Sequence, residues 1–486
     1  MRSPRRLAGL SHMTRHPFFS PPPCEEGLGV GVDDWGTSGP QSLAPPPQPS
    51  PTRGEGKATA VPFAIALHRR GACPGLSAPL PTGDGLLVRL MPTDSVALDA
   101  FIGFCEAARQ YGNGTIEISA RGSLQVRGLT PRSAPLFASA VAELGIVAHE
   151  GVSVVADPLV HDVGVTIDTA DTAAELRRTL ANARLVLSPK VSVVVDGGGR
   201  LHLDVVSADI RLRAAGPAQR PRLWVGLGGD GASATWLGSI APKEAVGVVL
   251  DLLTMIAAHG PTARAADILR AEGVEAFHSV SAAWIAGSPA PPRRMAAQMV
   301  GLHPARDGTL AIGIGLAFGH AHADALAQIV SIAASHGAQA VRPAPDRAML
   351  LIGAAAQDVV DLTATVERLG FVVRADDPRR RIAACPGAPA CASGLMPARA
   401  LAAALTPTLE PILEQRRNGV SVHISGCPKG CAHPMPAALT LVGTPRGCGI
   451  VHHGSARAPP GHYVDPADLG AEISRIVAKT NEAAHG

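Results

Sequence analysis

The strongest constraint on this sequence is two close pairs of cysteines in its C-terminal quarter. Cys385 and Cys391 have five residues between them, and Cys427 and Cys431 have three. Helix-breaking residues lie inside or beside both pairs: Pro386, Gly387, Pro389, Gly426, Pro428 and Gly430. The chain must therefore turn sharply at each pair. Four thiols so arranged are most simply interpreted as the ligands of one inorganic centre.

The spacing favours a [4Fe–4S] cluster, which needs four thiolates around a small polyhedron. Two alternatives stay open at this point, a structural zinc site and a pair of disulfides. Zinc sites usually have about two to four residues between paired cysteines, so the Cys385 pair fits zinc poorly. No secretory signal is recognised near Met1, so we expect a reducing compartment in which disulfides are rare.

Length, composition and charge limit the number of domains and the kinds of partner that this chain can have. A chain of 486 residues exceeds one ordinary domain, and with 46% hydrophobic but 3% aromatic residues its cores must rely on Ala, Val and Leu. A net charge of +3 gives no support for nucleic-acid binding. No apolar run reaches the length of about 18 residues that a membrane span needs. We therefore expect a cytoplasmic protein with no membrane or nucleic-acid partner.

Two stretches of the chain repeat one order of elements. Gly83-Asp84-Gly85 and Asp307-Gly308 are turns, and after each the pattern predicts a strand, a helix, two strands and a closing helix. An internal duplication explains this order, with chance similarity of short segments as the alternative. The preceding residues 1–65 are rich in Pro and Gly, and we expect them to be disordered.

A longer α/β segment follows each repeat. In the first, residues 191–195 form an apolar run typical of a buried strand, and residues 202–206 are predicted to pair with it as a hairpin. Residues 243–259 are predicted to form a long apolar helix. The second longer segment carries the paired cysteines and is expected to end in a helix near residues 467–479.

These motifs resemble a known superfamily. The Cys-x5-Cys and Cys-x3-Cys pairs are similar to the cluster signature of the sulfite and nitrite reductases, in which the last cysteine, here Cys431, also lies against a bound sirohaem. The sequence of residues 423–434, HISGCPKGCAHP, resembles the precorrin-3B synthase branch of this superfamily more than the reductases. That branch acts in aerobic cobalamin biosynthesis.

The resemblance extends over about residues 65–480 and implies an α+β fold. Duplicated ferredoxin-like half-domains would alternate with two larger α/β domains of the sulfite/nitrite reductase type about a pseudo-twofold axis. The implied boundaries are a tail (1–65), a first ferredoxin-like unit (66–148), a first larger domain (149–288), a second ferredoxin-like unit (289–372) and a second larger domain with the cluster cysteines (373–482).

The superfamily holds an eight-carboxylate tetrapyrrole with arginines, whose planar fork suits carboxylates. By resemblance the tetrapyrrole-binding residues here would be Arg89, Arg121, Gln125, Arg127, Lys190 and Arg211. For any isolated arginine, an ordinary surface charge is the alternative. Sulfite reductases have two lysines where this chain has Lys190 and Ser192, and the loss of one cation weakens the reductase interpretation.

The resemblance implies oxidation of precorrin-3A by O2, with a hydroxyl placed at C20 and a γ-lactone closed from the ring A acetate. The cluster at Cys385, Cys391, Cys427 and Cys431 would pass electrons from an unidentified donor, and a non-haem iron would activate O2. No His-x-Asp/Glu pattern stands out, so no iron ligands are assigned. A sirohaem-dependent sulfite or nitrite reductase, and a non-catalytic tetrapyrrole or iron–sulfur binding protein, are the alternatives; sirohaem is expected under the reductase alternative alone.

Overall fold

The computed structural model describes residues 74–485, apart from 149, 161, 218 and 416–418. The predicted disordered tail and Cys24 lie outside the described residues. Within them, the strands form four sheets of five strands each. No described helix is both long and apolar enough to cross a membrane.

Two of the sheets are built from the two repeats, and each takes one strand from the other repeat. The first has the order β1-β2-β5-β4-β13 and the second β11-β12-β15-β14-β3. Their strands are β1 (Leu80–Thr82), β2 (Gly85–Leu90), β3 (Val96–Ala97), β4 (Thr115–Ile118), β5 (Leu124–Leu129), β11 (Gly301–Pro304), β12 (Leu310–Gly315), β13 (His320–His322), β14 (Ala340–Ala344) and β15 (Ala348–Ala354). Because β3 pairs with β14 and β13 pairs with β4, the two repeats form one module.

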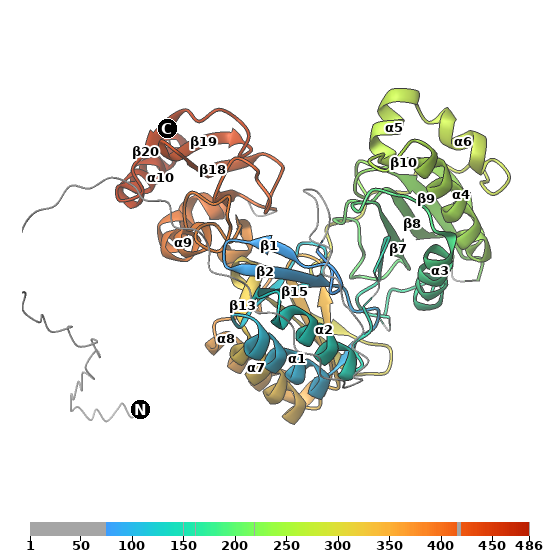
Figure 1. The fold of residues 1–486 in the computed structure, drawn as a ribbon, viewed down its shortest axis with the longest axis horizontal. Coiled ribbons are helices and arrows are strands. Elements are labelled where there is room, and N and C mark those ends of the chain that lie inside the picture. Colours follow the sequence, from blue (N-terminus) through green and yellow to red (C-terminus); the bar gives the residue numbers. More distant parts are fainter. Residues whose placement is uncertain (1–73, 149, 161, 218, 416–418, 486) are drawn as a thin grey trace, which may run out of the picture. The chain divides into compact units, whose positions relative to one another are not determined.

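Helices of the two repeats pack in a row and share a hydrophobic core with both sheets (Figure 1). They are α1 (Leu98–Tyr111), α2 (Ser133–Glu143), α7 (Ala323–Ser335) and α8 (Val359–Arg368). Phe101, Phe104 and Phe137 are fully buried in this core, with ring centroids 5.9 Å and 5.8 Å apart. Cys105 is also buried there as a small core residue.

The other two sheets also repeat one topology. In β6-β7-β8-β9-β10 and in β16-β17-β18-β19-β20 the first three strands run parallel and the last two pair antiparallel. The strands are β6 (Ser153–Ala156), β7 (Ser192–Asp196), β8 (Ile210–Ala215), β9 (Arg222–Leu227), β10 (Thr235–Ile240), β16 (Ile382–Ala384), β17 (Val422–Ser425), β18 (Ala437–Thr444), β19 (Gly447–Gly454) and β20 (His462–Val464). Their helices are α3 (Ala170–Ala183), α4 (Ala245–Ala258), α5 (Ala265–Glu272), α6 (Glu275–Ser281), α9 (Ala398–Gln415) and α10 (Leu469–His485).

The predicted α+β architecture with duplicated units is confirmed, as is the apolar helix at α4. The predicted hairpin of residues 191–195 with 202–206 is wrong. The strand β7 pairs in parallel with β6 and β8, and residues 202–206 form a loop. Leu203 and Val206 are buried because the loop packs against this sheet, in a cluster with Val155 and Val194, whereas Val205 is exposed. The apolar residues of a partly buried loop were therefore mistaken for a strand.

A matched pair of substitutions tests the shared core. We expect Phe137→Ala to lower the free energy of unfolding by about 3–5 kcal/mol, because it empties a fully buried site. The neighbouring Leu136→Ala should change it by no more than about 0.5 kcal/mol, since half of Leu136 is exposed. Denaturant unfolding followed by circular dichroism measures both. Equal effects would contradict the packing described here.

Candidate functional site

Parallel pairing of β16 with β17 brings the two cysteine pairs to one edge of a sheet. Cys385 directly follows β16, and Cys427 comes two residues after the end of β17. Ala384 lies opposite Ile424 in this ladder, and the Cys385 amide donates to the Ile424 carbonyl at 3.3 Å. Because parallel strands end on the same side of a sheet, the loops that follow them meet.

The four thiols lie on these two loops and influence one another electrostatically. The pKa of the Cys385 thiol is raised by burial and also by the charges of Cys391 and Cys427. Burial and the charges of Cys427, Cys385 and Cys391 likewise raise the pKa of Cys431. This mutual repulsion indicates that the four sulfurs lie within electrostatic range of one another. A metal centre would remove it, because bound thiolates are neutralised by the metal.

Backbone donors already point at the first of these sulfurs. The Gly426 amide donates to Cys385 Sγ at 3.1 Å, and Gly387 also donates to this sulfur. Hydrogen bonds to ligating sulfurs are a feature of iron–sulfur sites and adjust their potential. Lys429 Nζ donates to Ser393 Oγ at 2.7 Å and so joins the two loops. The residues present therefore fit a four-thiolate cluster.

Glycine is required where the two loops cross. A Cβ placed on Gly426 would lie 2.8 Å from Gly387 Cα and 3.5 Å from Cys385 Sγ. A Cβ on Gly443, in the next strand, would lie 2.4 Å from the Gly426 carbonyl oxygen. The cysteine loops are thus held by backbone packing as well as by hydrogen bonds.

The first repeat contacts the cysteine loop through Arg127. Its guanidinium binds Asp84 at 2.9 Å, lies 3.5 Å from Glu117 and donates to the Ala390 carbonyl. The Gly83 amide donates to the same carbonyl at 3.1 Å. Arg127 is thus fully engaged by protein groups, and its position supports the loop instead of a ligand.

A large cavity of about 930 Å³ lies beside the cysteines. It is lined by residues of the first repeat, by residues of the segment 148–191, by Arg264, and by Cys431 and Pro434. Cys431 is the exposed member of the four cysteines, and its thiol is at this wall. The volume lies in the upper part of the range of ligand pockets, about 300–1,000 Å³.

The described lining carries five cationic side chains and one carboxylate. The cations are Arg89, Arg121, Arg177, Lys190 and Arg264, and the carboxylate is Glu150. Glu150 is bound by Ser77, and Arg264 makes a two-pronged ion pair with Asp209 at 2.9 and 2.8 Å. Among the described residues, Arg89 and Lys190 form no ion pair. The cavity therefore has an excess of positive charge that an anionic ligand would balance.

Of the six predicted binding residues, three line this cavity: Arg89, Arg121 and Lys190. Arg89 donates to Gln125 Oε1 at 3.1 Å, and Arg121 donates to Ser192 Oγ at 3.4 Å. Gln125 does not line the cavity itself, but its hydrogen bond positions the Arg89 side chain. Arg211 is fully buried elsewhere and donates to the Leu203 and Val206 carbonyls. Sequence reasoning missed Arg177, on α3, and Arg264, which directly precedes α5, because neither lies in a recognisable motif.

Among the described residues, one group of three possible metal ligands has all its ligand atoms within 4.8 Å of one another, namely Asp196, His202 and Asp204; the four cysteine sulfurs are not as close together as that. The expectation that no His-x-Asp pattern is present was wrong, because His202-Leu203-Asp204 is such a pattern. Arg294, however, donates to both carboxylates, at 2.6 and 2.9 Å for Asp204. These bonds raise the pKa of Arg294 despite its burial. A guanidinium already supplies the cation here, so the residues do not fit an iron site.

The histidines beside the cluster cysteines also lack the features of an iron site. His423 is fully buried with no partner for either ring nitrogen among the described residues, and its ring lies 5.8 Å from that of His433. Burial, then His433 and Arg347, lower the pKa of His423 to about 4. The pair of His423 and His433 includes no carboxylate. The positive charge of the nearby Arg347 also disfavours binding of a metal cation there.

Comparison with known proteins defines the class first. Residues 79–144 match the family model of the nitrite/sulfite reductase ferredoxin-like half domain. The solved structure of the Mycobacterium tuberculosis NirA protein aligns with a TM-score of 0.66 at 20% identity, over 81% of this chain and 80% of that one. A sulfite reductase [ferredoxin] of the same organism is 28% identical over 30% of this chain and 27% of its own. The chain therefore has the fold of the sulfite and nitrite reductase superfamily.

Within that class one relative is much more similar. The precorrin-3B synthase of Sinorhizobium sp is 38% identical over 416 residues, which are 85% of this chain and 89% of the relative. The chain belongs to the precorrin-3B synthase family, which is a family of enzymes.

Glycine packing at the cysteine loops gives a direct test. We expect Gly426→Ala to destabilise the fold by about 1–3 kcal/mol, because its Cβ would overlap Gly387. It should also lower the iron content reached by anaerobic reconstitution. Gly470→Ala is the matched control, because nothing lies within 4 Å of a Cβ at this exposed helical position. Wild-type melting temperature and iron content in Gly426→Ala would contradict the close loop packing.

Proposed function

We propose that this enzyme oxidises precorrin-3A with O2, placing a hydroxyl at C20 and closing a γ-lactone from the ring A acetate. The observation that carries the proposal is the positively charged cavity with Cys431 in its wall. The similarity to a precorrin-3B synthase over most of both chains supports the same activity.

Arg89, Arg121 and Lys190 would bind and orient the substrate through its peripheral carboxylates. Arginine donates two parallel hydrogen bonds to one carboxylate, so it fixes the direction of the group as well as its charge. Gln125 holds Arg89 by accepting a hydrogen bond at 3.1 Å, and Ser192 does the same for Arg121 at 3.4 Å. Lys190 is exposed and would act as a point charge. Such fixed donors set the macrocycle at one depth beside Cys431.

The overall reaction constrains what must reach the cavity. One oxygen atom of O2 enters the substrate and the other leaves as water, which requires two electrons and two protons from outside the substrate. A [4Fe–4S] cluster held by Cys385, Cys391, Cys427 and Cys431 would supply those electrons one at a time from an external donor. The Gly426 amide would stabilise the thiolate of Cys385. We assign no non-haem iron, since no described group of residues fits it.

Replacement of a cluster ligand tests the proposal. We expect Cys427→Ala to abolish both the broad cluster absorption near about 400 nm and the O2-dependent consumption of precorrin-3A, since a methyl group cannot ligate iron. Cys448→Ala is the control, because Cys448 is a buried residue outside the two pairs and should leave the spectrum unchanged. Absorption and EPR spectra after anaerobic reconstitution provide the measurement. Retention of both signals in Cys427→Ala would place the centre elsewhere.

The same purified protein separates the two related functions. A strong Soret band with sulfite or nitrite reduction, and no turnover of precorrin-3A, would identify a sirohaem reductase. Binding of a tetrapyrrole with no turnover would indicate a carrier.

The role of the cavity cations is tested by Arg121→Ala. We expect the dissociation constant for the tetrapyrrole to rise about tenfold, because a charge-assisted hydrogen bond is lost, with no change in the cluster spectrum. Arg132→Ala, an exposed arginine outside the cavity lining, should leave the affinity unchanged. Fluorescence titration measures both. Unchanged affinity in Arg121→Ala would remove this residue from the binding site.

A further inference from the structure

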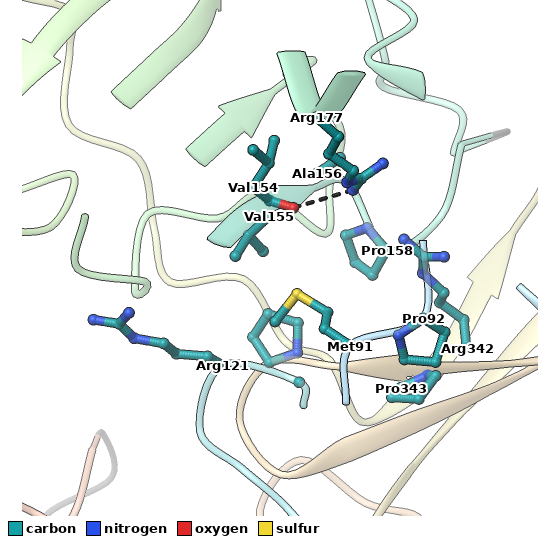
Figure 2. Close-up of a pocket in the computed structure, with 12 residues that line it drawn as sticks. Met91, Pro92, Arg121, Val154, Val155, Ala156, Pro158, Arg177, Arg342 and Pro343 are labelled. Atoms are coloured by element: carbon teal, nitrogen blue, oxygen red, sulfur yellow. Dashed lines mark hydrogen bonds between the residues drawn. The ribbon is translucent and has the colours of Figure 1, made fainter. Parts of the chain in front are cut away.

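A small hollow of about 20 Å³ opens beside the large cavity (Figure 2). The two share Met91, Arg121, Val154 and Arg177 in their linings, so the hollow is a side branch of the cavity. The hollow adds a cation that the main cavity lacks, Arg342.

Two arginines from distant parts of the chain meet at this hollow. Arg177 lies on α3 and Arg342 on β14 of the second repeat. Arg177 donates to the Val154 carbonyl at 3.1 Å, which leaves the rest of its fork available. Figure 2 shows both guanidinium groups beside Pro158, whereas Arg121 points away from them.

The pair has no counter-charge at ion-pair distance. Among the described residues, neither arginine has a carboxylate within 4.0 Å, and the acid that influences both, Asp94, is exposed. Burial lowers the pKa of Arg342 to about 10. The charge of Arg177 contributes to this decrease in pKa, and the charge of Asp94 offsets only part of it. Burial also lowers the pKa of Arg177. Two partly desolvated like charges destabilise the ligand-free fold unless an anion joins them.

The size of the hollow restricts that anion. A space of about 10–15 Å³ holds one water-sized group, so this hollow accepts the oxygens at the tip of a carboxylate but not a whole tetrahedral anion. The remainder of such a ligand must lie in the adjoining large cavity.

We infer that Arg177 and Arg342 form a subsite for one peripheral carboxylate of the tetrapyrrole bound in the cavity. The inference rests on the proposed function and adds a second anchoring point, formed by α3 and the second repeat, to that formed by Arg89 and Arg121 on the first repeat. A carboxylate held there accepts hydrogen bonds from both guanidinium groups and fixes the rotation of the macrocycle about its own axis.

The test uses the reconstituted full chain and uroporphyrin as the eight-carboxylate probe, with binding followed by fluorescence quenching. We expect Arg342→Met to raise the dissociation constant on the order of tenfold. Arg342→Lys, which keeps the charge but loses the fork, should fall between Met and wild type. Arg178→Met, next to Arg177 but exposed, should bind as wild type does. Without ligand, the melting temperature of Arg342→Met should be no lower than that of wild type. The substitution removes a buried charge that the neighbouring Arg177 repels.

The possible outcomes are distinguishable. Wild-type affinity in Arg342→Met would overturn the subsite, whereas failure of the wild type to bind uroporphyrin would overturn the proposed function instead. A lower melting temperature of Arg342→Met with unchanged affinity would show a structural role and also overturn the subsite. Sulfate is tested alone: if it stabilises wild type but not Arg342→Met while uroporphyrin affinity is equal in both, the hollow binds inorganic anions and the inference is wrong.

Discussion

The parallel ladder between β16 and β17 is the interaction on which the site depends. It places Cys385 and Cys427 at one edge of a sheet, and the hydrogen bond from the Gly426 amide to Cys385 Sγ, 3.1 Å long, forms across that ladder. A shift of the register would move the two loops apart along the strands. The exposure of Cys431 to the cavity, and with it the relation between cysteines and ligand, follows from this pairing.

The duplicated architecture shows how one scaffold serves two purposes. In the first larger domain, Asp157 directly follows β6, and the Gly197 amide after β7 donates to its Oδ2 at 2.8 Å. This bond has the same place in the topology as the one between Gly426 and Cys385. A carboxylate accepts the hydrogen bond in one half and a thiol in the other. The first half thus gains a structural polar network that includes Asp196 and Arg294, while the second gains four thiols suited to a metal centre.

The cationic side chains in and around the cavity also fall into two groups. Arg127, Arg211 and Arg264 are satisfied by protein carboxylates or carbonyls and hold loops in place. Arg89, Lys190 and Arg342 have no such ion pair among the described residues and face open space. An arginine without a carboxylate partner in a partly dry cavity costs stability, which a bound polyanion restores. The first group therefore supports the fold, whereas the second group is available to the ligand proposed above.

The sequence by itself determined the paired cysteines, the repeat and most of the elements, because these are expressed in local spacing, turn residues and hydrophobic period. It could not determine which arginines meet at the cavity. Arg121, Arg177 and Arg342 come from three segments, and the pairing of β3 with β14 and of β13 with β4 that joins the two repeats is a long-range choice. The loop at residues 202–206 shows the same limit. Its apolar residues reflect partial burial, but only tertiary packing decides whether such a segment pairs as a strand or lies against a sheet as a loop.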